Sequence, residues 1–588
     1  MAQVELRHQE DRNTQFVNVP LMTEEPQSTA PQTEAGLPDA KVRALGDAQR
    51  RKQGASAGHQ TVVFLLLALQ TALSIFLVVY YNHVYETQDL DAFGAAIESG
   101  DILAVALIST EIFQEQRPSQ HMKNTYTAFL SVVIALNFLV GMFSILKLNR
   151  PGIRVAILCQ VTVWSTMHLQ MSLDEGLTVV AGVVNLASVV TVAALFRLSD
   201  AIQEYRIGSD YTPPTLRGIF MWRVAAAVAD LCLVIMGVVI IVLTNTLDLK
   251  ASLRQLFIDL VQWSAAILGG IAIVTGIIGL LGNLGLRTFH SRFMLISCVA
   301  LSLAVLSSAC VELVWYSVAE GIVTFSCDLA NHASLFGWDD DKCESQLNLF
   351  TADIAMFFLF IVTAGFAAWT NLCLSEAVQS HGIAKGEDAF MWTVGHPFNV
   401  AGRTFSRVAV TQFLIRSEMF LLWTLGVFLC AFTIGVDRDN KSVLGQLDWL
   451  LKDLWLVVGG VLGVAVCRWV GHHTSWIEPR NLSYLAVVCQ VWLVGNVLNT
   501  FLYAMSTYEN GFTTEPWWMS FLGIANGQYP GDRKDLLRGT AVVSGLLFAS
   551  QLFALCLNFV EIESDYSLND KFIWEVPPSS PEDDLGEA

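Results

Sequence analysis

The sequence predicts an all-α polytopic membrane protein with twelve transmembrane helices arranged as three four-helix units. Three observations support this fold class. Of the 588 residues, 53% are hydrophobic and only 15% are charged, whereas about a quarter of the residues in soluble domains are charged. Twelve apolar runs approach the roughly 20 residues that a helix needs to cross the hydrocarbon layer. Short sequence matches also recur between the thirds of the chain.

The twelve apolar runs are the expected transmembrane helices, because a segment in lipid must satisfy its backbone polar groups within the helix itself. All fifteen prolines of the chain fall outside these runs. Proline kinks or breaks a helix interior, so we expect straight, closely packed helices. The runs lie approximately at 60–81, 125–146, 153–173, 176–196, 219–243, 261–281, 293–316, 353–374, 417–436, 453–470, 482–504 and 536–560.

The orientation follows from the loops between the runs. The first 58 residues are polar and contain no cleavable signal peptide, so the first run serves as its own anchor. With the N-terminus in the cytosol, lysine and arginine are more frequent in the inner connections than in the outer ones. We therefore expect both termini to be cytosolic. We expect the protein itself to lie in the plasma membrane or in a secretory-pathway endomembrane.

Internal similarity indicates that one unit is used three times. The motif "LSDAIQ" at Leu198 returns as "LSEAVQ" at Leu374, each at the end of a fourth helix. The third helices begin with "ILCQV" around Cys159, "ISCVA" around Cys298 and "VVCQV" around Cys489. The expected division is a disordered cytosolic tail 1–58, unit 1 at 59–205, unit 2 at 206–385, unit 3 at 386–562 and an acidic disordered cytosolic tail 563–588.

Each unit resembles tetraspan membrane proteins in architecture, with four helices, cytosolic ends and a longer second outer loop. The "CCG" motif of tetraspanins and the cysteine pattern of claudins are absent. The resemblance therefore concerns the arrangement of helices and carries over no functional residue.

Two cysteines, Cys327 and Cys343, are the only ones outside the apolar runs. They fall on the expected outer side, where an oxidising compartment would join them in a disulfide. Such a bond closes a loop of about fifteen residues, for which the chain-entropy model gives about 3 kcal/mol. On the same side, Asn440 in "NKS" is a glycosylation acceptor by pattern, close to the membrane.

Four polar residues are candidates for an intramembrane site. Asp230 lies near the middle of its helix, where an ionisable group costs about 2.5–3.5 kcal/mol on insertion scales. Arg223 lies two turns away on the same helix face, placed to approach it. Glu312 and His168 lie closer to the outer surface, and we expect Glu312 to reach the interface. Two interpretations stay open for Asp230: an ion or proton site, and a protonated or hydrogen-bonded packing residue.

The absence of several sequence motifs argues against some classes of function. No Walker loop, His-Glu-x-x-His motif, nucleophile elbow or metal-spaced cluster of cysteine and histidine is present, so we expect no enzyme, no cofactor and no metal centre. Much of the net charge of −19 lies in outer loops and in the C-terminal tail. No basic stripe with interleaved aromatic residues accompanies it, which argues against a nucleic-acid partner.

Two functions remain. The first is a non-enzymatic membrane organiser or interaction protein, which would act through lateral helix packing and outer loops on membrane-protein partners or on further copies of itself in the lipid bilayer. The alternative is a secondary transporter or channel for a small solute or ion, with Asp230 as the intramembrane site. Proline-free helices with few midplane charges favour the first function, and the twelve-helix architecture together with Asp230 near the midplane favours the second.

Overall fold

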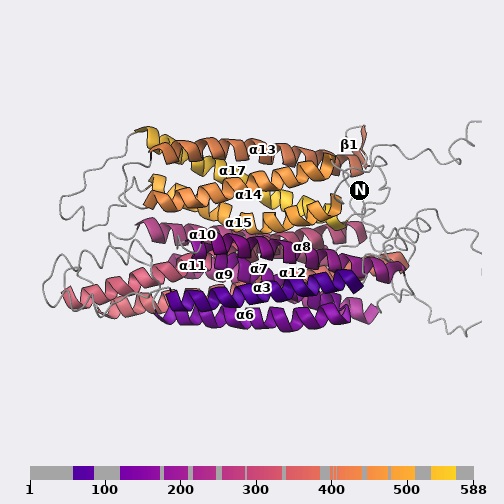
Figure 1. Ribbon diagram of the computed structural model, residues 1–588, viewed down its shortest axis with the longest axis horizontal. Coiled ribbons are helices and arrows are strands. Elements are labelled where there is room, and N and C mark those ends of the chain that lie inside the picture. Colours follow the sequence, from indigo (N-terminus) through magenta and orange to yellow (C-terminus); the bar gives the residue numbers. More distant parts are fainter. Residues whose placement is uncertain are drawn as a thin grey trace, which may run out of the picture. The chain divides into compact units, whose positions relative to one another are not determined.

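Twelve α-helices and one short β-hairpin make up the part of the chain that the computed structural model describes. These residues are 57–84, 120–172, 178–208, 216–246, 255–284, 288–333, 340–384, 398–400, 403–405, 407–439, 446–473, 479–509 and 531–563. The helices are α3 (Ala57–Val84), α6 (Gln120–Lys147), α7 (Arg150–Ser172), α8 (Thr178–Gly208), α9 (Leu216–Thr246), α10 (Gln255–Leu284), α11 (Thr288–Ala333), α12 (Asp340–Ala384), α13 (Arg407–Asp439), α14 (Gln446–His473), α15 (Pro479–Glu509) and α17 (Gly531–Glu563). Figure 1 shows them along the chain.

The helical character of the chain is confirmed, with one local difference. The strands β1 (Phe398–Val400) and β2 (Arg403–Phe405) pair antiparallel, with Phe398 opposite Phe405. They lie in the long connection before α13, which the sequence places among the irregular segments. The hairpin is thus a small exception to an all-α chain.

Ten helices in the described part of the chain are long and apolar enough to cross a membrane. The two remaining runs, 153–173 and 453–470, lie in the helices α7 and α14, and the apolar stretch of α14 is the shorter Leu454–Val470. The ten stretches are His59–Val79, Thr127–Lys147, Val183–Ile202, Arg217–Asn245, Gln262–Leu284, Ser291–Leu313, Leu347–Val378, Phe413–Asp437, Tyr484–Met505 and Asp535–Phe559.

The distribution of side chains reverses that of a soluble protein. Large apolar residues lie on the outer helix faces, as at Phe420, which is 73% exposed, and at Leu146. Polar residues such as Gln160 and Asn371 are buried between the helices. A surface of this kind is stable only against an apolar solvent, so lipid is the surrounding medium that these helices require.

The helices contact one another in three sets that follow the chain. In the first set α3 contacts α6, α6 contacts α7, α7 contacts α8, and α8 contacts α3. The same pattern joins α9, α10, α11 and α12. It is repeated by α13, α14, α15 and α17, which lie side by side in Figure 1. Within each set, every helix therefore has at least two neighbours from its own set.

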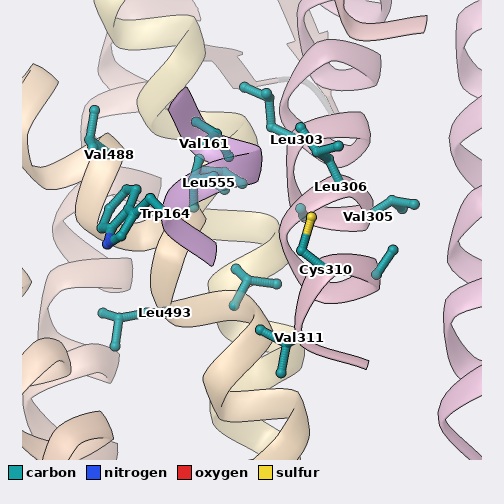
Figure 2. Close-up of a cluster of buried hydrophobic side chains, with 14 of the residues drawn as sticks. Val161, Trp164, Leu303, Val305, Leu306, Cys310, Val311, Val488, Leu493 and Leu555 are labelled. Atoms are coloured by element: carbon teal, nitrogen blue, oxygen red, sulfur yellow. The ribbon is translucent and has the colours of Figure 1, made fainter. Parts of the chain in front are cut away.

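The contacts between the sets converge on two helices, α15, which touches α7 and α8 of the first set and α10 and α11 of the second, and α11. Helix α11 touches α7 from the first set and both α15 and α17 from the third. In its most apolar stretch 89% of the residues are buried, and the value for α15 is 78%, whereas it is at most 50% for the other eight stretches. Figure 2 shows the resulting cluster, in which Trp164 of α7 and Leu555 of α17 lie with Leu303, Leu306 and Val488.

Polar and aromatic contacts join α7, α11 and α15 at this junction. The rings of Trp164 and Trp492 stack with centroids 5.9 Å apart and planes 5° apart. The Ser165 and Ser307 hydroxyl oxygens are 3.1 Å apart, within hydrogen-bond distance. A Cβ added at Gly495 of α15 would lie 3.2 Å from the backbone oxygen of Ser307, so glycine permits the close approach of these two helices.

The expected long loop at 317–352 is largely helical, which corrects the sequence prediction. Helix α11 has 46 residues and continues to Ala333, and α12 has 45 residues and begins at Asp340. The segment contains no proline that would end a helix. Both helices therefore extend beyond their apolar stretches.

A tight turn sets the start of α7. Leu148 has a φ of 50°, and its backbone N–H donates to the Ile145 oxygen at 3.3 Å, while the Asn149 N–H donates to the Ser144 oxygen at 2.8 Å. This pair of hydrogen bonds is a Schellman motif with leucine at the left-handed position usually taken by glycine. The turn reverses the chain within two residues, which brings Arg150 to the first position of α7.

Several predictions fall outside the described residues. The tails 1–56 and 564–588 and the acceptor Asn440 lie there, so the predicted disorder and glycosylation are untested. Cys327, Cys343 and His168 belong to helices α11, α12 and α7, but their side chains are outside the described part. The predicted disulfide stays a prediction.

Candidate functional site: the Asp230 centre

Asp230 lies at the middle of the 31-residue helix α9 and is 0% exposed. The other three helices of its set contribute neighbours: Gly279 from α10, Cys298 from α11 and Asn371 from α12. We call these four residues the Asp230 centre. It lies inside the set, away from the faces that carry exposed apolar side chains.

One oxygen of the Asp230 carboxyl accepts the hydrogen bonds of the centre. Asn371 Nδ2 donates to Asp230 Oδ1 at 2.6 Å, and Cys298 Sγ donates to the same oxygen at 3.7 Å. Asn371 Nδ2 also donates to the Ala367 backbone oxygen at 2.9 Å. Two acceptors, Asp230 Oδ2 and Asn371 Oδ1, are buried without a hydrogen-bond donor among the described residues. The centre therefore has more acceptors than donors.

Glycines of α10 make room for this carboxyl. A Cβ added at Gly279 would lie 2.5 Å from Asp230 Cγ, and one added at Gly276 would lie 2.5 Å from the Asp230 backbone oxygen. Two turns further along the pair, a Cβ at Gly237 would lie 2.6 Å from the Gly269 backbone oxygen. The glycine-rich run of α10 thus permits close packing against α9, as its sequence indicates.

The structure does not bring Arg223 to Asp230. The side chain of Arg223 is exposed, and its backbone oxygen accepts a hydrogen bond from Asn283 Nδ2 at 2.6 Å. Among the described residues, Asp230 has no salt bridge. Arg223 lies two turns from Asp230 toward the start of α9, and its side chain is on the outer face of the helix set.

A second group of buried acids lies in the same four helices. Glu312 is 0% exposed and Asp353 is 3% exposed, so Glu312 does not reach the interface as expected. The reason is that other helices enclose this part of α11, whose apolar stretch Ser291–Leu313 is mostly buried. Both carboxyls lie near enough to the Tyr316 hydroxyl to interact with it. We refer to Glu312, Asp353, Tyr316, Thr244 and Ser264 as the Tyr316 cluster.

The other two sets each carry a buried amide network. In the first set Asn137 Nδ2 donates to Gln160 Oε1 at 2.5 Å, and both Gln160 Nε2 and Gln70 Nε2 donate to Ser188 Oγ. All four helices of the set contribute one residue. In the third set Asn558 Nδ2 donates to Gln490 Oε1 at 2.6 Å, and Gln490 Nε2 donates to Glu418 Oε1 at 3.4 Å.

An ion-pair network joins α7 to α8 and α12. Glu376 forms ion pairs with Arg150, whose Nη1 lies 2.8 Å from Oε1, and with Arg154, whose Nη1 lies 2.9 Å from Oε2. Arg150 also reaches Asp200 at 3.5 Å and Ser199 Oγ at 3.1 Å. Asp200 and Glu376 occupy the same position in the two "LS[DE]A" matches of the sequence. The two matching acids therefore bind one arginine.

Sequence reasoning identified Asp230 and Glu312 but missed Asn371, Cys298, Asp353 and Tyr316. An asparagine, a cysteine and a tyrosine are ordinary residues in apolar helices, so they give no signal singly. Asp353 stands at the start of an apolar run, where an acid usually marks the interface. Among the described residues, no three or more histidine, cysteine, aspartate or glutamate side chains form a group that could hold a metal ion.

Comparison with known proteins gives no match to a family model, a curated protein or a solved structure. The class of the protein therefore rests on its own structure. An apolar helical bundle with exposed aliphatic faces and a polar interior has the form of an integral membrane protein.

Proposed function

We propose that the protein is a secondary transporter or channel that moves a small cation, or a solute coupled to it, through the set α9–α12, with Asp230 as its intramembrane site. The observation that carries this proposal is the buried Asp230 carboxyl, whose Oδ2 has no hydrogen-bond donor among the described residues. A membrane organiser has no need of an uncompensated acid inside a helix set. Intramembrane acids of this kind mark ion or proton pathways.

The geometry suits reversible binding of a proton or a small cation. Burying an ionised carboxylate without a counter-charge is very costly, and a bound cation removes that cost. Asn371 and Cys298 hold Oδ1 in place, so the carboxyl does not need to reorganise on binding. The proposal includes the predicted organisation: twelve spans, three four-helix units and both termini in the cytosol.

Flux measurements on the full-length protein in liposomes test this function. Proton flux is followed with a trapped pH-sensitive dye under a potassium diffusion potential, and sodium uptake is followed in parallel with ²²Na⁺. We expect one of these cations to enter faster than in protein-free liposomes. Asp230→Asn removes the ionisable group while keeping the shape, so it should lower that flux at least tenfold.

The matched control is Glu344→Gln, which neutralises an exposed carboxyl on α12 and should leave the flux unchanged. Size-exclusion chromatography of the purified variants reports whether each is folded. Equal flux of the Asp230→Asn variant and the parent, or no flux above protein-free liposomes for either cation, would contradict the proposal.

A second function, the membrane organiser, is favoured by one observation on α14. Gly459 and Gly463 are exposed, four residues apart on one face, and a Cβ added to either meets no atom within 4 Å. Small residues at this spacing let two transmembrane helices approach closely. The expected partner is a second copy of the chain or another membrane protein.

Crosslinking in native membranes separates the two functions. If α14 mediates lateral contacts, Gly463→Ile should abolish a crosslinked dimer, whereas Gly365→Ile, at another open position on α12, should retain it. If only protomers are recovered from the parent protein, lateral association through this face is wrong.

A further inference from the structure

The Tyr316 cluster lies in the same helix set as Asp230 but far along it. Cys298 is level with Asp230 because it donates to that carboxyl, and Glu312 follows Cys298 by fourteen residues on α11. At 1.5 Å per residue the two acids are separated by about 21 Å along the helix. The cluster is therefore a second polar position in the set, distinct from the Asp230 centre.

All four helices contribute oxygen atoms to this cluster. Glu312 and Tyr316 are four residues apart on α11 and share a face. Thr244 of α9 lies with its hydroxyl oxygen 3.3 Å from the Tyr316 oxygen, and Ser264 of α10 lies beside the Glu312 carboxyl. The cluster thus draws carboxyl and hydroxyl groups to the inside of the set.

Helix α12 adds the second carboxyl. The rings of Phe357 and Phe350 lie on Tyr316, with centroids 4.4 Å and 6.5 Å from it. Asp353 stands three residues after Phe350 and four before Phe357, so all three residues share the α12 face that packs against Tyr316. The carboxyl of Asp353 therefore points to the same side as the tyrosine.

Neither acid has its charge compensated among the described residues. Both oxygens of Glu312 and Asp353 Oδ2 are buried without a hydrogen bond of good geometry, and no described lysine, arginine or histidine pairs with either carboxyl. Hard oxygen ligands that surround uncompensated negative charge are the ligands that alkali and alkaline-earth cations prefer. We propose that Glu312, Asp353 and the Tyr316 hydroxyl form a binding site for a hard monovalent cation, with Na⁺ as the favoured ion.

The two carboxyls and three hydroxyls offer seven oxygen atoms, a number that Ca²⁺, with six to eight oxygen ligands, can also use. Competition between NaCl and CaCl₂ therefore decides between the two ions, and stronger displacement by CaCl₂ would contradict Na⁺. A role for this site in a cation path that continues to Asp230 rests on the proposed function. The binding of Na⁺ at the cluster does not depend on that function.

Equilibrium binding of ²²Na⁺ to the purified full-length protein in detergent tests the site. We expect saturable binding that unlabelled NaCl displaces and that CaCl₂ and KCl at equal concentration displace less. Glu312→Gln and Asp353→Asn, which change an oxygen to an amide nitrogen without changing size, should each weaken binding at least tenfold. Tyr316→Phe removes only the hydroxyl and should weaken binding a few-fold.

Two variants separate this site from the transport hypothesis. Asp230→Asn should keep the saturable ²²Na⁺ binding that Glu312→Gln and Asp353→Asn lose, even if its flux and any binding at position 230 are lost, and the exposed Glu344→Gln should behave as the parent in both assays. If either acid variant fails to fold, the other one and Tyr316→Phe carry the test. Absence of saturable ²²Na⁺ binding by the parent, or parent-like binding by the folded variants, would overturn the site. If the parent protein binds ²²Na⁺ but shows no cation flux in liposomes, the proposed binding site is retained and the proposed transport function is rejected.

Discussion

Gly279 is the residue of α10 that makes room for the Asp230 carboxyl. A methyl group at this position would overlap the carboxyl atoms, because the added Cβ lies 2.5 Å from Asp230 Cγ and 2.6 Å from Oδ1. Gly279→Ala should therefore push α10 away from α9 and destabilise the protein by about 1–3 kcal/mol, the usual cost of overpacking. SDS titration in mixed micelles measures this free energy of unfolding.

The control for this prediction lies on the same helix. A Cβ at Gly270 meets no atom within 4 Å, so Gly270→Ala should leave the free energy of unfolding within about 0.5 kcal/mol of the parent, as for substitutions away from packed features. If the two alanine variants are equally stable, the close contact between α10 and the Asp230 carboxyl is wrong.

At the scale of residues, the sequence identifies acids within the membrane more readily than the residues that donate hydrogen bonds to them. One aspartate in an apolar run is visible without a structure, because its burial is costly. The hydrogen bonds that hold Asp230 come from residues 68 and 141 positions further along the chain. Which neutral polar residue meets it depends on how α9, α11 and α12 are rotated against one another, and an apolar helix with weak amphipathicity does not specify its rotation.

At the scale of elements, Gln160 connects α7 to α6 and α8. Its side chain accepts from Asn137 at 2.5 Å and donates to Ser188 at 3.3 Å. Gln160→Leu would leave the Asn137 amide without this acceptor, and an unsatisfied buried polar group costs about 1–3 kcal/mol. We expect a loss of that size in the free energy of unfolding, measured in mixed micelles.

A double-mutant cycle isolates the interaction between the two amides. Asn137→Leu alone should also destabilise the protein, whereas the double variant should lose less than the sum of the two single variants, because neither amide is then left unsatisfied. Groups in one hydrogen-bond network show coupling of about 0.5–3 kcal/mol. Strict additivity would mean that the two side chains do not interact.

The arginines of α7 provide a prediction about the contact between α7 and α12. Glu376 pairs with both Arg150 and Arg154 at less than 3 Å, whereas Asp200 reaches Arg150 at 3.5 Å. Removing one partner of a buried ion pair costs about 3–5 kcal/mol. Glu376 is partly exposed, so we expect Glu376→Gln to fall near the lower end of that range.

Asp200→Asn serves as the comparison for this prediction, because it removes the longer of the two contacts to Arg150. Its loss in the free energy of unfolding should be smaller than that of Glu376→Gln in the same mixed-micelle assay. A larger loss for Asp200→Asn would show that the longer ion pair dominates the network.

The helices themselves were largely predictable, and their ends less so. Long apolar runs without proline have one stable form in lipid, which is why the described residues of all twelve runs lie in helices. The segment 317–352 was predicted to be a loop because its polar residues were taken to mark the end of the helix. Polarity ends a transmembrane segment, but a helix without a breaker continues past that boundary, as α11 does to Ala333.

At the scale of the whole molecule, the predicted disulfide tests the orientation of all helices together. If Cys327 and Cys343 lie outside the cytosol, neither should react with a maleimide polymer on intact cells until a reductant is added, and both should react afterwards. A shift in gel mobility measures this. Single Cys327→Ser and Cys343→Ser variants should each show one reactive thiol without reductant.

The outcome opposite to this expectation is also informative. If both thiols react without reductant in permeabilised cells and not in intact cells, the pair lies in the cytosol, and the predicted orientation is inverted. The remaining nine cysteines are free of disulfides in the structure, so they serve as an internal reference for labelling. Most of them are buried or half-buried, and they should react more slowly than an exposed thiol.

The central place of α11 has a consequence for biogenesis. During synthesis α11 leaves the ribosome before α15 and α17. In the nascent chain, the side of α11 that carries Ser307 and Ser308 therefore has no helix packed against it until α15 and α17 are made. A chain halted after α12 leaves uncovered the backbone against which Gly495 later packs, with that seam turned to lipid. Prematurely terminated forms of this protein should therefore be recognised by membrane quality control and degraded, even though two complete helix sets have already been inserted.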